Sequence, residues 1–176
     1  VILRIDATFV PQEWADAHPE AMARDEFDEP MGWPALESAA WLKALEEEAK
    51  AFCRHARRAP YASRIAGALL EGMHEGQWRY APMRTADFSA ASMQAWRAWL
   101  RQRYGKAEQL RAAWGDAEAD FENAEPPRGP LALAEGAAHL LNLADPEARR
   151  RADLRLFNSE HISKAALRVA GVFKKN

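Results

Sequence analysis

Two short apolar runs on either side of one long amphipathic segment constrain the fold of this chain more than any other feature of its sequence. The first run, residues 1–10 (VILRIDATFV), is rich in β-branched and apolar side chains and predicts a buried strand that Pro11 ends. The second, residues 65–70 (IAGALL), is apolar without alternation, which predicts a strand buried on both faces, as in a parallel sheet. A long crossover between two strands is typical of parallel pairing, because antiparallel strands are commonly joined by short hairpins.

The segment between the two runs predicts a helix. Ser38 is placed to cap its first turn, and Pro60 closes it. The apolar residues recur at spacings that keep them on one face of a helix with about 3.6 residues per turn. These residues are Trp41, Leu42, Leu45, Ala49, Phe52, Cys53 and Ala56. The resulting βαβ unit has too few strands to close a sheet, so we expect residues 1–176 to be an internal piece of a larger α/β domain.

The other segments predict loops and further helices. Residues 11–34 are punctuated by proline and glycine and are expected to form a loop. The acidic stretch 25–29 within it is expected to be a solvated surface, with an ion site as the alternative. Residues 116–144 show little pattern beyond a small apolar patch at 131–143.

Three helices are expected in the remainder, which makes the predicted fold class helix-rich α/β. One runs from a cap at Asp87 or Ser89 to Tyr104, and a short one covers residues 106–114. Asp145-Pro146 begins a long helix that continues to about Phe173.

Composition excludes several classes of function. A formal net charge of -2 gives no reason to expect a nucleic acid or an anionic membrane as partner. No apolar run reaches the length of about 18 residues that a membrane span needs, and the single cysteine, Cys53, rules out an internal disulfide. The histidines are scattered, and neither a phosphate-binding glycine loop nor a Ser-His-Asp spacing is present, so no metal or cofactor is expected. The sequence gives no indication of the compartment.

The loop after residue 70 concentrates side chains that can carry chemistry. In a parallel α/β barrel the active site lies at the carboxyl ends of the strands, and here that position holds Glu71, His74, Glu75, Trp78 and Tyr80. A carboxyl group beside apolar or aromatic neighbours has a raised pKa, which suits a general acid, and a tryptophan offers a flat face for a sugar ring. The alternatives are structural: Glu71 pairs with an arginine, His74 only makes hydrogen bonds, and Trp78 fills the barrel rim.

The middle of the chain resembles the β-galactosidases of glycoside hydrolase family 42 and their relatives. The matching positions are Trp96, Trp99-Leu100, Arg103-Tyr104-Gly105, Leu110 and Ala113-Trp114-Gly115. Arg111 departs from the asparagine that is usual there. Residues 61–67 resemble the approach to the fourth strand of these barrels, and residues 1–20 resemble the third strand and its loop.

The resemblance implies a partial (β/α)8 barrel, from about strand three to helix four, in a retaining glycosidase that acts on a β-linked sugar with two carboxylates. The family's acid/base is the glutamate of an Asn-Glu pair, and Gly72-Met73 fall on that pair here. We therefore favour Glu75 as the acid/base, with Glu71 as the alternative. Asp6, Trp14, His74, Trp78 and Tyr80 are expected to bind the substrate.

The family's nucleophile comes from strand seven, so the resemblance places it outside this chain, and the 176 residues alone are expected to be inactive. The expected partners are a carbohydrate and the rest of the barrel. Two other functions are left open: a carbohydrate-binding barrel that has lost its acid, and a helical interaction module unrelated to sugars.

Overall fold

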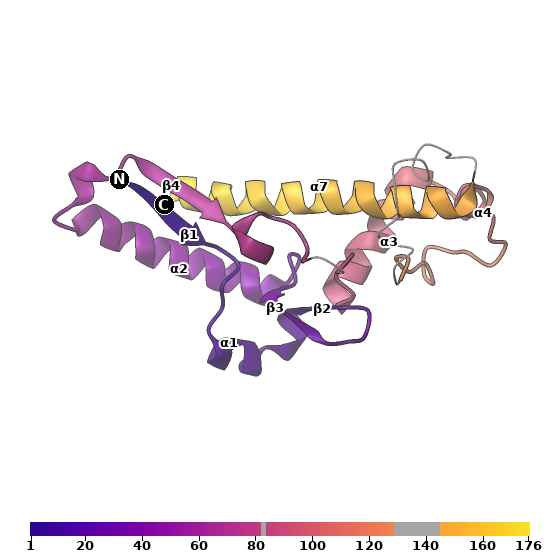
Figure 1. The fold of residues 1–176 in the computed structure, drawn as a ribbon, viewed down its shortest axis with the longest axis horizontal. Coiled ribbons are helices and arrows are strands. Elements are labelled where there is room, and N and C mark those ends of the chain that lie inside the picture. The colour runs from indigo at the N-terminus through magenta and orange to yellow at the C-terminus, as the bar shows by residue number, and fades with distance from the viewer. Residues whose placement is uncertain (82–83, 129–144) are drawn as a thin grey trace.

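The computed structural model describes residues 1–81, 84–128 and 145–176, and shows an elongated α/β structure with one long helix running along it (Figure 1). The apolar patch at 131–143 lies outside the described residues. Strands β1 (Ile2–Asp6) and β4 (Gly67–Glu71) pair in parallel, with Ile2 opposite Gly67 and Asp6 opposite Glu71. The predicted parallel pairing is therefore confirmed, and the carboxyl ends of both strands lie side by side.

Helix α2 (Ala39–Arg58) makes the crossover between these strands. The Ser38 hydroxyl accepts a hydrogen bond from the backbone N–H of Trp41 at 3.2 Å, as expected of an N-cap. Trp41, Leu45 and Ala49 form the buried face of this helix. A short 3-10 turn, η2 (Ala62–Arg64), leads from the helix into β4.

Both strands differ from the sequence prediction in length and in burial. β1 ends at Asp6 and does not reach residue 10, because the Asp6 carboxylate accepts bonds from the backbone N–H groups of Thr8 (2.9 Å) and Phe9 (3.1 Å) and turns the chain. Burial on both faces is wrong for β4, because Leu69 is 52% exposed, and Ile2 on β1 is 68% exposed. Only the face that carries Leu3, Ile5 and Leu70 is turned toward helices.

The prediction of a loop over residues 11–34 is also wrong. This segment forms helix α1 (Gln12–Ala17), the 3-10 turn η1 (Pro19–Ala21) and an antiparallel hairpin of β2 (Met22–Arg24) and β3 (Pro30–Pro34). The acidic stretch is solvated only in part, because Asp25 is 3% exposed. Its carboxylate closes the hairpin turn by accepting from the N–H groups of Phe27 and Glu29, each at 2.9 Å, and pairs with Arg84.

The three expected later helices are present as α3 (Ala90–Tyr104), α4 (Ala107–Trp114) and α7 (Pro146–Lys175). Ser89, not Asp87, caps α3, and the Asp145 carboxylate caps α7 through the N–H of Glu147. Gly115 ends α4 in the left-handed conformation, which glycine adopts without strain. A further 3-10 turn, η3 (His74–Gly76), lies after β4.

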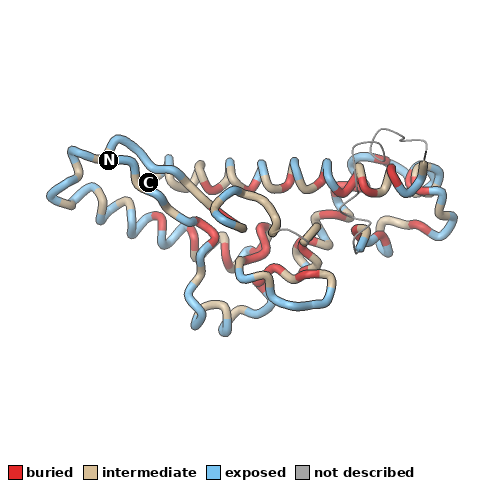
Figure 2. Tube along the Cα trace, in the orientation of Figure 1, coloured by how far each residue is buried: buried red, intermediate tan, exposed pale blue. Residues whose placement is uncertain are grey.

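Helix α7 contributes to two separate apolar clusters (Figure 2). Its first half places Leu154 and Phe157 against α3 and α4, and its second half places Ala165 and Val169 against α2 and the end of β4. Among the described residues, no helix combines the length and apolar character needed to cross a bilayer.

Candidate functional site

The loops that follow β1 and β4 are joined by a hydrogen bond. The backbone N–H of Met73 donates to the Thr8 hydroxyl oxygen at 2.6 Å, and that hydroxyl donates to Asp6 Oδ1 at 3.0 Å. The parallel register already places Asp6 opposite Glu71. Residues from two distant parts of the sequence therefore meet at the carboxyl end of the strand pair, which is where the sequence analysis predicted the candidate site.

The loop after β4 has an unusual backbone. Met73, Glu75 and Trp78 all have positive φ, at 60°, 53° and 51°. Non-glycine residues adopt this region uncommonly and at some energetic cost. A Cβ on Gly72 would lie 2.9 Å from the Thr8 methyl carbon, and one on Gly76 would lie 3.0 Å from Glu71 Cβ. Two glycines and three strained residues therefore shape this turn.

Glu71 is the more buried of the two candidate acids, with its side chain 19% exposed. The Arg4 guanidinium forms a bidentate pair with the Glu71 carboxylate. Nε donates to Oε1 at 2.8 Å, and Nη2 donates to Oε2 at 3.0 Å. Arg4 and Glu71 share one face of the strand pair, because parallel neighbours point to the same side. Sequence reasoning anticipated an arginine partner for Glu71 as the structural alternative but did not identify Arg4.

Glu75 lies on the turn itself, and its side chain is 59% exposed. Its Oε2 pairs with Arg79 Nη2 at 2.8 Å and lies 3.8 Å from His74 Nε2. Arg79 also bonds Gln77, Nε to Oε1, at 2.9 Å. His74, Glu75 and Arg79 thus form a second polar group on the loop, with ion pairs of its own.

The aromatic candidates pack against the apolar cluster at the end of β4. Trp14, Trp78 and Tyr80 are half-buried members of the cluster that also contains Trp41 and Met73. The Trp78 indole N–H donates to the carbonyl of Leu70 at 3.0 Å, which holds the ring against the end of β4. Trp14 contacts His18, with ring centroids 4.6 Å apart.

Tyr80 has a hydroxyl without exposed surface and without a hydrogen-bond partner among the described residues. Burial, followed by the negative charge of Asp87, raises the pKa of this phenol far above its usual value. The phenol therefore stays protonated at physiological pH.

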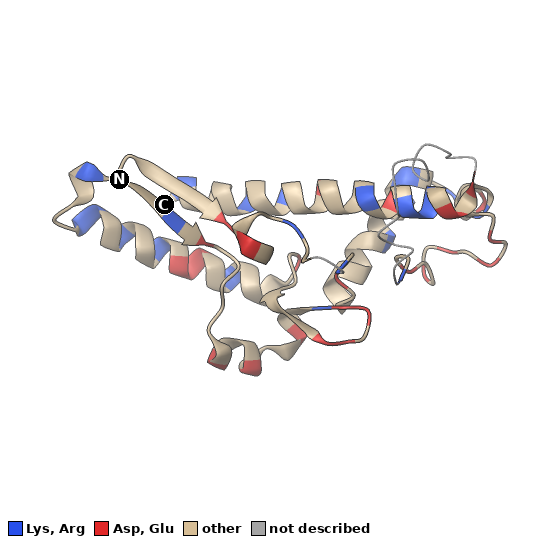
Figure 3. Cartoon of the chain, viewed as in Figure 1, with Lys and Arg blue, Asp and Glu red and all other residues tan. Residues whose placement is uncertain are grey.

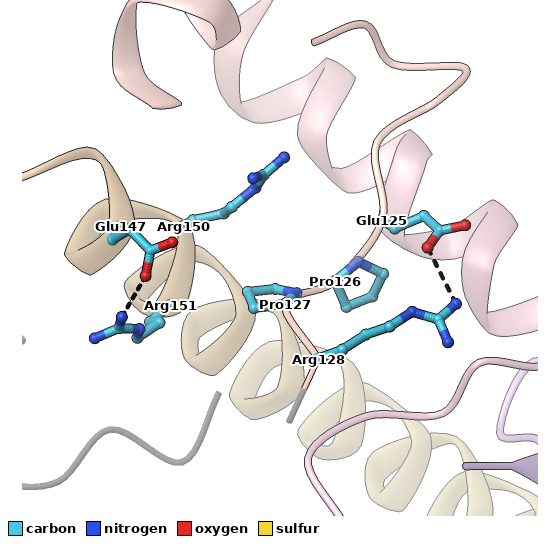
Figure 4. A pocket seen from close by; sticks show the side chains of 7 residues that line it. All are labelled: Glu125, Pro126, Pro127, Arg128, Glu147, Arg150 and Arg151. Carbon is cyan, nitrogen blue, oxygen red and sulfur yellow. Dashed lines mark hydrogen bonds and ion pairs between the residues drawn. The ribbon is translucent and has the colours of Figure 1, made fainter. Parts of the chain in front are cut away.

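Other charged features lie away from this edge. Arginines gather at the first turns of α7 (Figure 3), where a pocket of about 270 Å³ opens beside Pro126 and Pro127 (Figure 4). In it Arg128 pairs with Glu125, and Arg151 pairs with Glu147. Over residues 1–81, 84–128 and 145–176, no three His, Cys, Asp or Glu side chains cluster closely enough to hold a metal ion.

The parallel βαβ unit with polar loops at the carboxyl ends of its strands, together with the fold it shares with the solved structures described below, places the chain in the class of partial (β/α)8 barrels. The chain belongs to glycoside hydrolase family 42: the family model described as beta-galactosidase matches residues 1–174. No curated protein matches the chain.

Solved β-galactosidases share the fold. The enzyme of the psychrophilic Marinomonas ef1 is 19% identical with a TM-score of 0.69, and the match covers 99% of this chain and 25% of that chain. The cold-adapted enzyme of Rahnella sp. R3 is 19% identical with a TM-score of 0.65, covering 99% and 24%. The enzyme of Bacillus circulans sp. alkalophilus is 19% identical with a TM-score of 0.60, covering 96% and 24%. The chain thus spans about a quarter of the length of these structures.

Proposed function

We propose that this chain supplies the third and fourth strands of a glycosidase barrel that cleaves a β-glycosidic bond, with β-galactosides as the substrate class. Family membership supports the reaction class, and the neighbouring carboxyl ends of β1 and β4 support the position of the site. The observation that carries the proposal is the junction of both loops through Thr8 and Met73 at that edge.

In this proposal the acid/base comes from the loop after β4, and Glu75 is its first candidate. A retaining glycosidase needs one carboxyl group to protonate the leaving oxygen and a second, roughly 5–5.5 Å away, to attack the anomeric carbon. We assign the second group to a part of the barrel outside these 176 residues, so the isolated chain is expected to hydrolyse nothing. Asp6, Trp14, His74, Trp78 and Tyr80 are proposed to bind the sugar.

The test compares Glu75→Gln with Glu71→Gln in the complete open reading frame that contains this chain. Loss of a general acid lowers kcat/KM by about 10²- to 10⁴-fold for glycosides with an alkyl leaving group such as lactose. The loss of kcat/KM is much smaller for an aryl galactoside with an acidic phenol, because that leaving group needs no proton in the step that forms the glycosyl-enzyme. We expect this leaving-group dependence for Glu75→Gln alone. Its appearance in Glu71→Gln would transfer the role to Glu71, and its absence from both would reject the assignment.

A carbohydrate-binding barrel without catalysis is the second candidate function. It is favoured by Gly72-Met73, which occupy the position of the family's Asn-Glu pair, and by the ion pairs that engage both Glu71 and Glu75. Isothermal titration with galactose or lactose separates the two candidates. Binding without turnover in the complete protein supports this second function, and turnover excludes it.

A further inference from the structure

The Thr8 side chain connects the turn after β1 directly to the backbone of the loop after β4. It is 2% exposed, and its hydroxyl donates to Asp6 Oδ1 at 3.0 Å. The same oxygen atom of Asp6 also accepts from the backbone N–H groups of Thr8 and Phe9. The hydroxyl hydrogen is therefore directed toward Asp6, which leaves the oxygen lone pairs free to accept from Met73 N at 2.6 Å.

The loop needs such an anchor because its first residues are strained. Met73 has φ 60° and ψ -149°, a conformation that is essentially restricted to glycine and costs other residues on the order of 1–3 kcal/mol. Such a conformation persists only where surrounding contacts hold it. The Thr8 hydroxyl holds the amide of Met73, and a Cβ built on Gly72 would lie 2.9 Å from the Thr8 methyl carbon and 3.1 Å from the Trp78 ring, so both side chains pack closely against this glycine.

We propose that Thr8 is a positioning residue that holds the 72–80 loop in the shape that presents Glu75 and Trp78. It acts through the loop and touches no reacting atom. The catalytic meaning of this role rests on the function proposed above, whereas the anchoring itself is a property of the fold.

Hydrogen exchange at the Met73 amide, measured on the complete protein, tests whether Thr8 anchors the loop, and this test does not depend on activity. In Thr8→Val, which keeps the branched shape and removes the hydroxyl, the amide is expected to exchange at least about fivefold faster. Thr8→Ser keeps the hydroxyl and should retain the wild-type rate. Thr85→Val is the matched control, because Thr85 lies outside the loop and is half-buried. An unchanged rate in Thr8→Val, or equal acceleration in Thr8→Ser, would overturn the proposal.

Kinetics on the complete protein then test whether the anchoring matters to the reaction. Displacement of a catalytic group by about 1 Å can cost up to roughly a hundredfold in rate, so we expect kcat to fall about tenfold or more in Thr8→Val, KM to change little, and Thr8→Ser to restore most of kcat. Equal kcat in Thr8→Val and wild type would reject the positioning role. A wild-type protein without glycosidase activity would reject the proposed function instead, and the exchange rates would still decide the anchoring.

Discussion

At the scale of single residues, Asp153 on α7 is a fully buried charge whose partners come from other helices. Its carboxylate has no exposed surface. It accepts from the Tyr104 hydroxyl and from Trp114 Nε1 at 2.9 Å, and it pairs with Arg103 at 2.9 Å. These partners come from α3 and α4, so one side chain holds three helices together. Burial of this network, with Asp153 as neighbour, also raises the pKa of Tyr104.

Asp153→Asn is expected to lower the free energy of unfolding by roughly 1–3 kcal/mol, because a buried carboxylate that pairs with Arg103 and accepts from Tyr104 and Trp114 becomes a neutral amide with fewer acceptor positions. Urea denaturation of the purified chain measures this loss. Asp116→Asn is the control, because Asp116 pairs with Arg150 at the surface and should cost less than about 1 kcal/mol. Equal losses in both variants would contradict the role given to Asp153.

His161 makes stability depend on pH. It is 6% exposed, stacks on Phe157 and lies 3.5 Å from Glu37, and Arg168 and Lys164 add positive charge nearby. Burial lowers its pKa below the ordinary 6.5, with the two cations adding to this and Glu37 opposing it. The unfolded chain therefore takes up a proton before the folded chain does, and stability falls as pH drops below about 6.5.

His161→Gln is expected to weaken this loss between pH 7.5 and 5.5, measured as the shift of the urea midpoint. His55→Gln, at an exposed position of α2, should leave the loss unchanged. A His161 variant with the same pH dependence as wild type would show that other groups cause it.

At the scale of elements, the ends of the helices are set by their local chemistry. Gly105 and Gly115 end α3 and α4 with φ of 71° and 59°. A Cβ on Gly105 would meet open space, whereas one on Gly115 would lie 2.9 Å from Cγ of Pro146 at the start of α7. The turn after α4 is therefore packed directly against the first turn of α7.

Gly105→Ala is expected to cost about 1 kcal/mol of stability, from backbone strain alone. Gly115→Ala should cost roughly 1 kcal/mol more, because overpacking against Pro146 is added to the strain. Thermal unfolding of the two variants measures the difference. If Gly115→Ala costs no more than the roughly 1 kcal/mol expected of left-handed backbone strain alone, the contact with Pro146 carries no energetic weight.

The elements that sequence could predict are those with strong local signals. Ser38, Ser89, Asp145 and the two glycines mark helix ends, and the apolar runs mark the parallel pair. The hairpin of β2 and β3 was missed because its strands contain Pro30, Gly32 and Pro34, which are typical of loops. The partner of Glu71 could not be assigned in advance, since Arg4 meets Glu71 only through the sheet register.

At the scale of the whole molecule, the pair of β1 and β4 is a sheet of only two strands within the described residues. β1 and β4 pair only with each other, so each has a free edge within the described residues. Leu69 is exposed beside these edges. Unpaired edges with apolar side chains are sites of association between chains, and a net charge of -2 offers little repulsion against it.

The 176-residue chain is therefore expected to self-associate with rising concentration in sedimentation experiments. Leu69→Lys should reduce this association by placing a charge next to the open edge. Leu167→Lys is the matched control, because Leu167 is 73% exposed but lies on α7, where no strand edge is open. Equal effects of both substitutions would point to general solubility, not to the strand edges.

The span of α7 across both apolar clusters has a consequence for how the molecule comes apart. A protein whose two hydrophobic cores are joined by a flexible linker can unfold one core while the other stays folded. Here the single helix α7 contributes to both clusters. Unfolding of the helix that begins near Leu154 therefore removes packing partners near Val169 as it proceeds along the helix. The two halves of the molecule should then unfold in a single cooperative step. Destabilising substitutions at the end of α7 remote from the strands should also lower the stability of the loop that carries Glu75.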